Sequence, residues 1–461
     1  MQSPADLDLR RAAVARLWDL PRGAVLVPAG LSVPISGTDQ YHDFHAHPEF
    51  TYLAGARSRG AVLGFDPAEG WALFVPVATL EDQVWAGRGE DVDALQQSTG
   101  LSVRPLAELR SWLERRRGEA FAILGNHDIT HSASGYGLES WPALELDVDE
   151  VLSARLGDQV AESRRAKDAS ELSLMRAAAD ASRAGHLLAM RTARPGMSER
   201  RVQVELEAEF FRTGAERTAY GSIVGTGSNG AVLHFSPTSR PLRDGELVLI
   251  DAGAEWEGYA SDVTRTFPVG PRFEGIQRDL YQLVLDVQQA AITDVRAGVE
   301  YKDLHLAAAG RIADGLVELG ILRGDRAGLV ERDAHALFFP HGLGHMLGLA
   351  THDAGGCLEG RTPSDRFGLK WLRADLPLQP GYVVTTEPGI YFIRALLTDP
   401  ARRDQYRDAV NWDRIDTLLD LGGIRIEDDV LVTESSPDVL TGAIPKFIPE
   451  IETLRAEAHS R

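Results

Sequence analysis

Two apolar stretches of the sequence end in an acidic residue at the same distance from a glycine. Asp251 stands six residues after Gly245, and Glu387 stands six residues after Gly381. A carboxylate at the end of a buried strand is costly unless it is paired or bound to a cation. The matched offsets therefore predict a duplicated half-domain in which each copy donates one acid to a metal site.

Two further acids lie in strand-like segments beside polar neighbours. Asp262 shares one face of the run Tyr259–Phe267 with Thr264, and Glu427 shares a face with Arg425, because side chains alternate with a period of two along a strand. We expect both acids to join the same metal site.

Three histidines, His341, His345 and His352, fall within twelve residues. Four carboxylates with a single imidazole favour manganese, cobalt or zinc, and their charge suffices for two ions that share carboxylates. Two such ions, about 3.5–4 Å apart, generate a hydroxide nucleophile and polarise a carbonyl. With His345 as the imidazole ligand, His341 and His352 are candidates for proton transfer and for hydrogen bonds to an oxyanion.

Four segments resemble the signatures of the pita-bread metallopeptidases, the family of methionine aminopeptidase, aminopeptidase P and prolidase. They are PHGLGHMLGLATHD, IDAGAEWEGYASDVTRTF, TTEPGIYF and GGIRIEDDVLVT. The resemblance covers nearly the whole chain and is closest to prolidase, the Xaa-Pro dipeptidase. It implies hydrolysis of the bond in front of proline with two divalent metal ions per subunit, manganese first, with cobalt and zinc as alternatives.

The resemblance also implies the ligands of those ions, which are Asp251, Asp262, His345, Glu387 and Glu427. Two of them, Asp262 and Glu427, would bridge the ions, and Glu387 would also carry a proton.

Further residues match positions that surround the metals in this family. His234 would act outside the metal ligands, and His341 and His352 would bind the carbonyl and carboxylate side of the substrate. Thr264 and Arg425 would orient the two bridging acids.

The part of the substrate beyond proline distinguishes the members of this family. A dipeptidase must bind the carboxylate that directly follows proline, and the planar fork of arginine suits that group. Arg373, in the prolidase-like segment GLKWLRA, is the candidate. Tyr220 resembles a prolidase pocket residue, and Trp85 resembles the tryptophan that prolidases extend across a homodimer interface to the neighbouring site.

Other activities are compatible with the same fold. Prolidase is the first expectation, and aminopeptidase P, which removes the N-terminal residue from longer Xaa-Pro peptides, is the alternative. A non-catalytic peptide-binding module is the rival of another class, disfavoured because such modules lack metal ligands that this chain retains. Organophosphate hydrolysis by the same metal hydroxide is expected to be incidental.

The first part of the chain alternates strands with helices, which predicts an α/β layer. Apolar runs at 24–28, 61–65, 71–76 and 120–124 predict buried strands, and 106–117 predicts a helix. The charged stretch 149–172 predicts a linker helix. A long amphipathic helix is then expected from Glu171 to about Thr192, before Pro195-Gly196.

The remainder mixes strands at 247–251, 259–268, 383–387 and 423–432 with helices at 276–297 and 304–319. We therefore expect an α+β protein with two domains. Residues 1–160 would form an α/β domain for dimerisation and for shaping the substrate entrance, and 161–461 a pita-bread catalytic domain of two related halves.

Composition limits the possible partners. The chain has 461 residues and a formal net charge of 48 − 68 = −20, which disfavours nucleic acid and anionic membranes. A single cysteine, Cys357, excludes an intrachain disulfide and favours a reducing compartment.

The start of the chain carries acids and no apolar core, so it does not resemble a secretory signal. We expect a cytoplasmic homodimer that acts on small proline-containing peptides. The loop with His42, His45 and His47 is interpreted as an interface loop rather than as a lining of the entrance.

Overall fold

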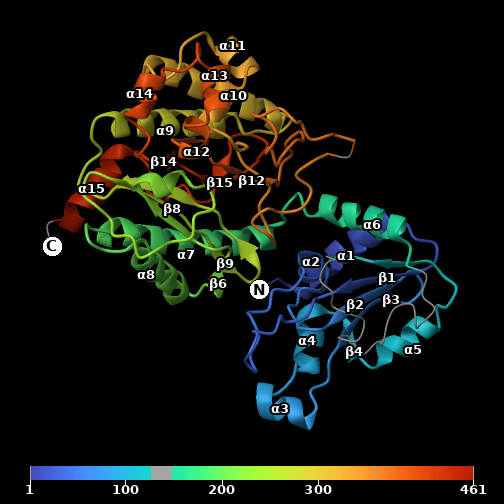
Figure 1. Ribbon diagram of the computed structural model, residues 1–461. Coiled ribbons are helices and arrows are strands. Elements are labelled where there is room, and N and C mark those ends of the chain that lie inside the picture. Colours follow the sequence, from blue (N-terminus) through green and yellow to red (C-terminus); the bar gives the residue numbers. More distant parts are fainter. Residues whose placement is uncertain (1, 126–147, 359, 460–461) are drawn as a thin grey trace. The chain divides into compact units, whose positions relative to one another are not determined.

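The computed structural model describes residues 2–125, 148–358 and 360–459. The chain divides into two compact units, Met1–Arg164 and Arg165–Arg461. Figure 1 colours the first unit blue to cyan and the second green to red.

The first unit contains a sheet of five strands in the order β4-β3-β2-β1-β5, within the described residues. Its strands are β1 (Ala24–Pro28), β2 (Val62–Asp66), β3 (Gly70–Val75), β4 (Ser102–Pro105) and β5 (Phe121–Ile123). Its helices are α1 (Pro4–Trp18), α2 (Pro48–Ala54), α3 (Leu80–Ala86), α4 (Val92–Thr99), α5 (Glu108–Glu114) and α6 (Glu150–Ser163).

Aromatic residues join helices to both faces of this sheet. Trp18 of α1 packs against Phe65 and Trp71, with ring centroids 5.4 and 5.3 Å apart. Trp112 of α5 packs against Phe74 at 5.7 Å. Trp71 and Phe74 are three residues apart in β3, so their side chains point to opposite faces. Helices α1 and α5 therefore cover opposite faces of the sheet.

The second unit carries longer helices and short strands. Its helices are α7 (Ala169–Thr192), α8 (Glu199–Thr213), α9 (Ile276–Asp294), α10 (Tyr301–Glu318), α11 (Arg326–Glu331), α12 (Arg394–Leu397), α13 (Pro400–Gln405), α14 (Trp412–Asp416) and α15 (Ile448–His459), with 3-10 turns η3 (Gly227–Ala231) and η4 (Ala334–Leu337). Its strands are β6 (Arg217–Thr218), β7 (Ile223–Thr226), β8 (Leu247–Asp251), β9 (Ala254–Trp256), β10 (Tyr259–Ala260), β11 (Thr264–Pro268), β12 (Val383–Thr386), β13 (Gly389–Tyr391), β14 (Gly423–Arg425), β15 (Asp428–Leu431) and β16 (Asp438–Val439).

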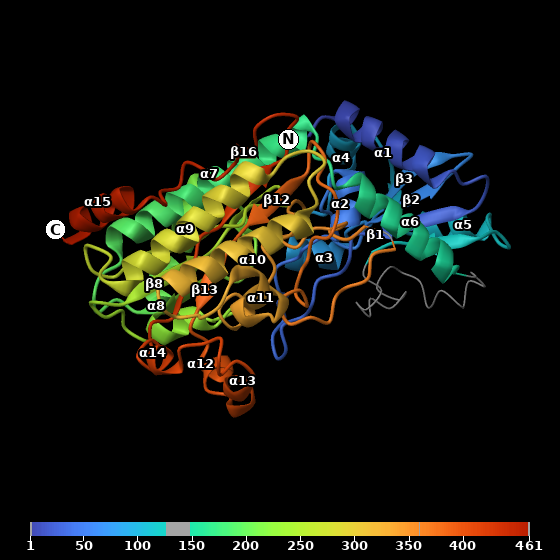
Figure 2. The same ribbon diagram turned by 90° about the horizontal axis from the view of Figure 1, so that it is seen from above.

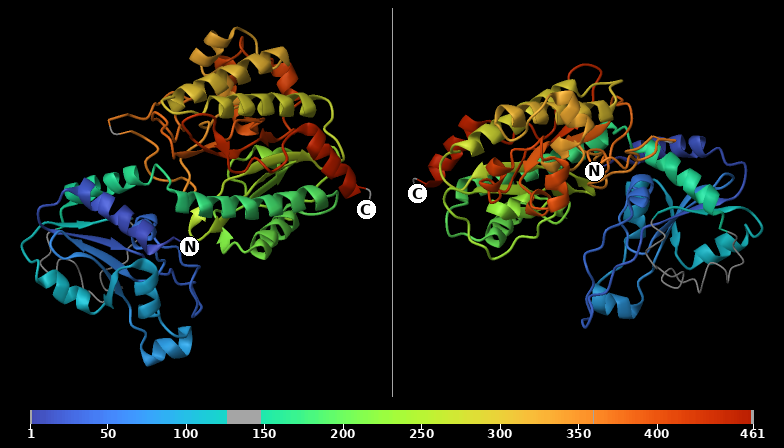
Figure 3. Two further views of the ribbon diagram at one scale, coloured as in Figure 1. Left: turned by 180° about the vertical axis from the view of Figure 1, so that it is seen from behind. Right: turned by 45° about the horizontal axis from the view of Figure 1, so that its top comes forward.

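These strands form small sheets in the orders β10-β9-β6, β11-β8-β7, β12-β15-β16 and β13-β14. Helix α7 contacts β9 and β10, α8 contacts β7, and α9 contacts β12, β13 and β14. In Figure 1, β8, β12, β14 and β15 lie between the α7–α8 pair and the α9–α10 pair. Figure 2 shows α9 beside α10, and Figure 3 shows the C-terminal helix α15 beside the end of α7.

The predicted strands at 24–28 and 247–251 have their expected bounds as β1 and β8. Two others are interrupted. The run 259–268 splits into β10 and β11, and 423–432 splits into β14 and β15. Both interruptions fall at candidate metal ligands.

The predicted linker helix over 149–172 is wrong in part, because α6 ends at Ser163 and α7 begins at Ala169. Between them, Ala166 forms a β-bridge with Tyr382. Asp168 then caps α7, since its side chain accepts the backbone N–H of Glu171 while the Glu171 side chain accepts that of Asp168. The cap begins a new helix at this point.

None of the helices in the described ranges combines the length and apolar character needed to cross a membrane.

Candidate metal centre

Strand ends bring the predicted acids together. Asp251 ends β8 and pairs in register with Thr264 of β11. Asp262 lies just before β11, Glu387 just after β12, and Glu427 between β14 and β15.

His345 is held next to β12, because its carbonyl accepts the Thr385 backbone N–H at 2.9 Å. The four acids and this histidine all line one cavity of about 930 Å³.

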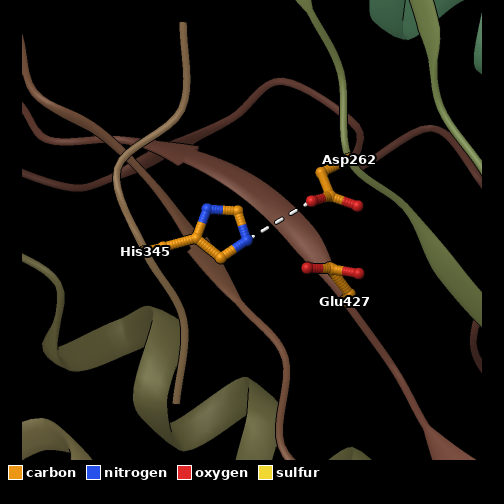
Figure 4. Close-up of side chains that lie close together, drawn as sticks. All are labelled: Asp262, His345 and Glu427. Carbon is orange, nitrogen blue, oxygen red and sulfur yellow. Dashed lines mark ion pairs between the residues drawn. The ribbon is translucent and has the colours of Figure 1, made fainter. Parts of the chain in front are cut away.

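The tightest part of this group is Asp262, His345 and Glu427, shown in Figure 4. Each offers a ligand atom within 4.8 Å of the other two, and all three are buried. His345 Nε2 lies 3.4 Å from Asp262 Oδ2 and 3.8 Å from Glu387 Oε1. The three side chains come from separate segments and converge on one point.

The ring of His345 has a defined orientation. Its Nδ1 donates to the carbonyl of Met346 at 3.0 Å, since a carbonyl can only accept. The neutral ring would therefore turn the lone pair of Nε2 toward carboxylates, an arrangement that needs a proton or a cation between them. A histidine ligand held by a carbonyl through its other nitrogen has this geometry.

The acids are strongly perturbed. Burial raises the pKa of Glu387 to about 7, although the charges of His345 and Arg425 oppose the shift. Burial, with the charges of neighbouring acids, raises the pKa of Glu427 well above its usual value. Burial also raises the pKa of Asp251, which Arg425 opposes. These carboxylates are therefore destabilised as anions.

Asp262 differs from the other three acids. Burial alone would raise the pKa of this carboxyl, but the hydrogen bond and charge of His345 hold it below the usual value. The backbone N–H of Asp262 donates to both carboxylate oxygens of the buried Asp429, at 3.2 Å each. Tyr220 Oη lies 2.6 Å from Asp251 Oδ1 and 2.6 Å from Asp262 Oδ1. One hydroxyl thus joins two acids.

Thr264 and Arg425 form a hydrogen-bonded network with the acids. Thr264 donates through Oγ1 to Glu427 at 2.8 Å and accepts from Arg425 Nε at 2.8 Å. Arg425 also donates to Asp251 at 2.5 Å. This pair was expected to orient Asp262 and Glu427. In the structure, Thr264 contacts Glu427 and Arg425 contacts Asp251.

His341 has both ring nitrogens engaged. Nδ1 donates to the Gly342 carbonyl and Nε2 meets the Tyr391 hydroxyl, each at 2.8 Å. Tyr391 Oη accepts from Arg425 at 2.8 Å, so it donates its own proton to His341. Burial and the charge of Arg425 lower the pKa of His341 to about 3, so the ring is neutral.

Three other predicted residues, His234, His352 and Arg373, also line the cavity. The ring of His352 lies 4.5 Å from that of His345 and nearly perpendicular to it. Burial, with the charges of His345 and Arg373, lowers the pKa of His352 to about 4. His352 is therefore neutral near pH 7.

The remaining predicted residues belong to the first unit. Trp85 lies in α3 and is 76% exposed, and the histidine-rich loop precedes α2. Their positions, on an exposed helix face and in a loop, assign no role to Trp85 or to these histidines.

Two residues at the site were not singled out from the sequence. Tyr391 links His341 to Arg425, and Asp429 holds the backbone of Asp262. Tyr391 lies four residues after Glu387 within TTEPGIYF, and Asp429 lies two residues after Glu427. The sequence signal that could have identified them is a polar side chain within four residues of a candidate metal ligand.

This donor set suits a divalent cation. Among the described residues, Arg425 is the one Lys or Arg that forms an ion pair with any of the four acids. Several buried carboxylates with so little compensation repel one another, and a divalent ion between them removes that cost.

Comparisons with known proteins agree with this geometry. Residues 173–434 match the metallopeptidase family M24, and residues 8–121 match the N-terminal domain of aminopeptidase P. The Xaa-Pro aminopeptidase of Escherichia coli is 32% identical over 100% of this chain and 99% of its own. A probable Xaa-Pro aminopeptidase of Fusarium vanettenii is 32% identical over 92% of this chain and 89% of its own.

Solved structures show the same likeness. The aminopeptidase PepP of Pseudomonas aeruginosa matches with a TM-score of 0.82 and 31% identity, over 100% of this chain and 99% of its own. Aminopeptidase P of Escherichia coli with the inhibitor Pro-Leu matches with a TM-score of 0.82 and 30% identity, over 100% of both chains. These relatives are named for the aminopeptidase that was the alternative expectation, and they support it better than prolidase, the first expectation. The chain belongs to metallopeptidase family M24, with the pita-bread fold, a divalent metal site and the N-terminal domain of aminopeptidase P.

Proposed function

We propose that this protein is a dimetal Xaa-Pro aminopeptidase, which removes the N-terminal residue from peptides whose second residue is proline. The observation that carries the proposal is the convergence of four acids and His345 on one cavity in a chain whose full-length relatives are named Xaa-Pro aminopeptidase. The cavity of about 930 Å³ lies near the upper end of small-molecule sites, about 300–1,000 Å³, which leaves room beyond a dipeptide.

The ligands of two metal ions would be Asp251, Asp262, His345, Glu387 and Glu427. When bound, the ions supply an ionised water and a polarised substrate carbonyl. The chain's own residues hold this arrangement: Thr264 fixes Glu427, and the backbone of Asp262 is fixed by Asp429.

Proton transfer and substrate binding would fall to residues on the cavity surface. The Glu387 carboxylate would accept a proton from the attacking water and donate it to the proline nitrogen as the peptide bond breaks. His352 and His234 would donate hydrogen bonds to the substrate carbonyl side through their ring N–H groups. Arg373 would bind a carboxylate of the substrate.

Manganese is the proposed metal in both positions, because oxygen-rich sites with one imidazole suit it. Metal analysis of the purified protein tests this, and two equivalents of zinc or cobalt per chain would replace the assignment. We further propose a cytoplasmic homodimer in which Trp85 reaches the neighbouring site. Trp85→Ala should raise KM in a protein that sediments as a dimer, and a monomeric, fully active protein contradicts the proposal.

Dipeptidase activity is the second candidate, and one observation favours it. Arg373 lines the cavity, and its side chain forms no hydrogen bond or ion pair with another described residue, so its fork is available for a carboxylate next to proline. The test compares kcat/KM for Ala-Pro and for Ala-Pro-Ala. Faster cleavage of Ala-Pro-Ala supports the aminopeptidase, and turnover of Ala-Pro alone supports the dipeptidase.

A further inference from the structure

We propose that Arg200 forms an additional subsite of this cavity, which binds a carboxylate on the part of the peptide that follows proline. The proposal rests on the proposed function and extends it to a preference among substrates.

Arg200 reaches the cavity from the second residue of α8. It lines the cavity together with Gln203, one turn along the same helix, and with Phe235, Ser236 and Pro237 of a following loop. Its Nη1 donates to Gln203 Oε1 at 2.6 Å. That partner is a neutral amide, which itself donates to the Glu207 carboxylate at 2.7 Å, so Arg200 has no direct ion pair with a described acid.

The neighbouring residue shows the contrast. Arg201 does not line the cavity, and its Nε lies 3.8 Å from Glu205 Oε1. No described carboxylate forms an ion pair with Arg200. In a protein with a net charge of −20, a cation without an acid that faces the substrate cavity is available for an acid of the substrate.

Hydrogen bonds of the preceding residue hold the backbone at the start of α8, next to Arg200. The preceding residue, Glu199, is fully buried, and its carboxylate accepts from the backbone N–H and hydroxyl of Thr238 at 3.2 and 2.7 Å. It also accepts from the Thr226 backbone at 3.1 Å and from the Asn229 side chain at 2.9 Å.

The loop is held at Arg200 as well, because the Arg200 N–H donates to the Thr238 carbonyl at 2.9 Å. The arginine and the loop wall beside it are thus held together, which lowers the entropy cost of binding.

The position gives the charge no structural benefit. A cation in the first turn of a helix faces the positive end of the helix dipole, where acids are preferred. Glu199 at the preceding position satisfies that preference. Helix stability therefore does not account for the charge of Arg200, which is exposed at the cavity.

Chemistry decides which side of the substrate Arg200 binds. The N-terminal residue of the substrate carries an α-ammonium group, which a guanidinium repels. The part beyond proline ends in a carboxylate and can also carry Asp or Glu. A carboxylate there can pair with the arginine fork through charge-assisted hydrogen bonds.

The test uses peptides that differ only in a carboxylate. Ala-Pro-Gln-amide carries none, Ala-Pro-Glu-amide carries one on the side chain, and free Ala-Pro-Gln carries one at the C-terminus. We expect one of the acids to raise kcat/KM of the wild type by about 3- to 10-fold over the amide, as for a partly exposed charge pair. The acid that does so identifies the source that binds.

Variants assign the effect to the residue. Arg200→Ala should bring the ratio close to one, and Arg200→Lys should keep part of it. Arg201→Ala removes the same charge from the adjacent position and should keep the full ratio and the basal rate. The proposal is overturned when Arg200→Ala keeps the ratio, when Arg201→Ala loses it equally, or when the preference follows an acidic first residue, as in Asp-Pro-Gln-amide.

A binding measurement separates this proposal from the proposed function. Pro-Glu-amide and Pro-Gln-amide, the corresponding products, compete with whichever substrate the enzyme cleaves, including Ala-Pro. If the enzyme leaves every tripeptide intact, the proposed aminopeptidase activity is contradicted. The subsite is still supported if Pro-Glu-amide inhibits more tightly than Pro-Gln-amide and if Arg200→Ala removes that difference. Equal inhibition constants in the wild type, with no preference for free Ala-Pro-Gln, contradict the subsite.

Discussion

The Thr264 hydroxyl bonds to one acid of the site and to the arginine that holds another. Thr264 stands beside Asp251 in the strand register and donates to Glu427, while it accepts from Arg425. Groups that hold ligands in this way affect metal affinity and rate because they fix the direction of the ligand lone pairs.

Thr264→Val tests this connection, because valine keeps the shape and removes the hydroxyl. We expect kcat/KM or metal affinity to fall roughly 10- to 100-fold. Thr266→Val is the matched control: Thr266 is buried two residues further along β11 and bonds only to the backbone of Arg425. Equal losses of activity in the two variants would contradict a specific role for Thr264. Steady-state kinetics with a metal titration gives both quantities.

Asp262→Asn removes one charge at the point where His345 and Glu427 meet. We expect turnover to fall by more than the roughly 100-fold typical of residues that only orient ligands, while the thermal midpoint of the metal-free protein falls. The second effect follows because His345 stabilises the Asp262 carboxylate in the folded chain, and asparagine lacks that charge. Near-normal rates would show that Asp262 is not a metal ligand.

Residues that act through the backbone could not be found from the sequence. Asp429 lies within the predicted strand 423–432, and nothing in the sequence shows that its carboxylate accepts the backbone N–H of Asp262, 167 residues earlier. The same holds for Tyr391, whose hydroxyl meets groups from other segments. By contrast, alternation predicts the directions of Thr264 and Arg425, because it is a local property of a strand.

At the scale of elements, apolar runs locate the strands but not their interruptions. The sequence pattern predicts one strand over 259–268, but the strand is interrupted at Ser261–Val263. There the Ser261 hydroxyl forms a hydrogen bond with Ser182, and Asp262 lies with the other acids of the site. The predicted strand at 423–432 breaks at Glu427 in the same way. Ligand geometry is set by tertiary contacts, and these override the local period.

The start of α7 gives a prediction about an element. Asp168→Ala removes the acceptor for the backbone N–H groups of Ser170 and Glu171. The expected cost is about 1 kcal/mol in the free energy of unfolding. Asp168→Asn should cost less, because asparagine is also a good cap. Denaturant titration measures both variants, and equal stability of Asp168→Ala and the wild type would contradict the role of the cap.

At the scale of the molecule, the second unit holds buried neutral histidines that make it sensitive to acid. Burial lowers the pKa of His186, His305 and His335 to about 4 each, below the usual 6.5 of the unfolded chain. The contribution of these neutral histidines to the free energy of unfolding is complete above pH 6.5. It is lost as the pH falls toward 4, up to about 3 kcal/mol for each histidine.

His186→Gln tests this origin of acid sensitivity, because glutamine can still donate to the Ala252 carbonyl that His186 Nε2 meets at 2.9 Å. The variant should lose less stability than the wild type between pH 7 and pH 5 in urea titrations. His459→Gln, at the end of α15, is the control and should keep the wild-type slope. An unchanged slope in His186→Gln would assign the acid sensitivity to other groups.

Metal binding should stabilise the second unit alone, since each unit has its own core and the acids lie in the second. Chelation is expected to remove about 3 kcal/mol, the stabilisation given by a ligand at 100 times its Kd. Hydrogen exchange should then increase in β8, β11 and β15 and stay constant in β1, β2 and β3.

Glu427→Gln provides the internal control for this chelation experiment. It should raise the thermal midpoint of the metal-free protein and lower that of the metal-bound protein. Without metal, the variant loses a buried charge that repels Asp262, Glu387 and Asp251, so its thermal midpoint should exceed that of the metal-free wild type. With manganese added, the variant has lost a ligand and should gain less than the wild type, so the order of midpoints reverses. A simple loss of packing would lower both midpoints alike, and that parallel shift would contradict a metal site at Glu427.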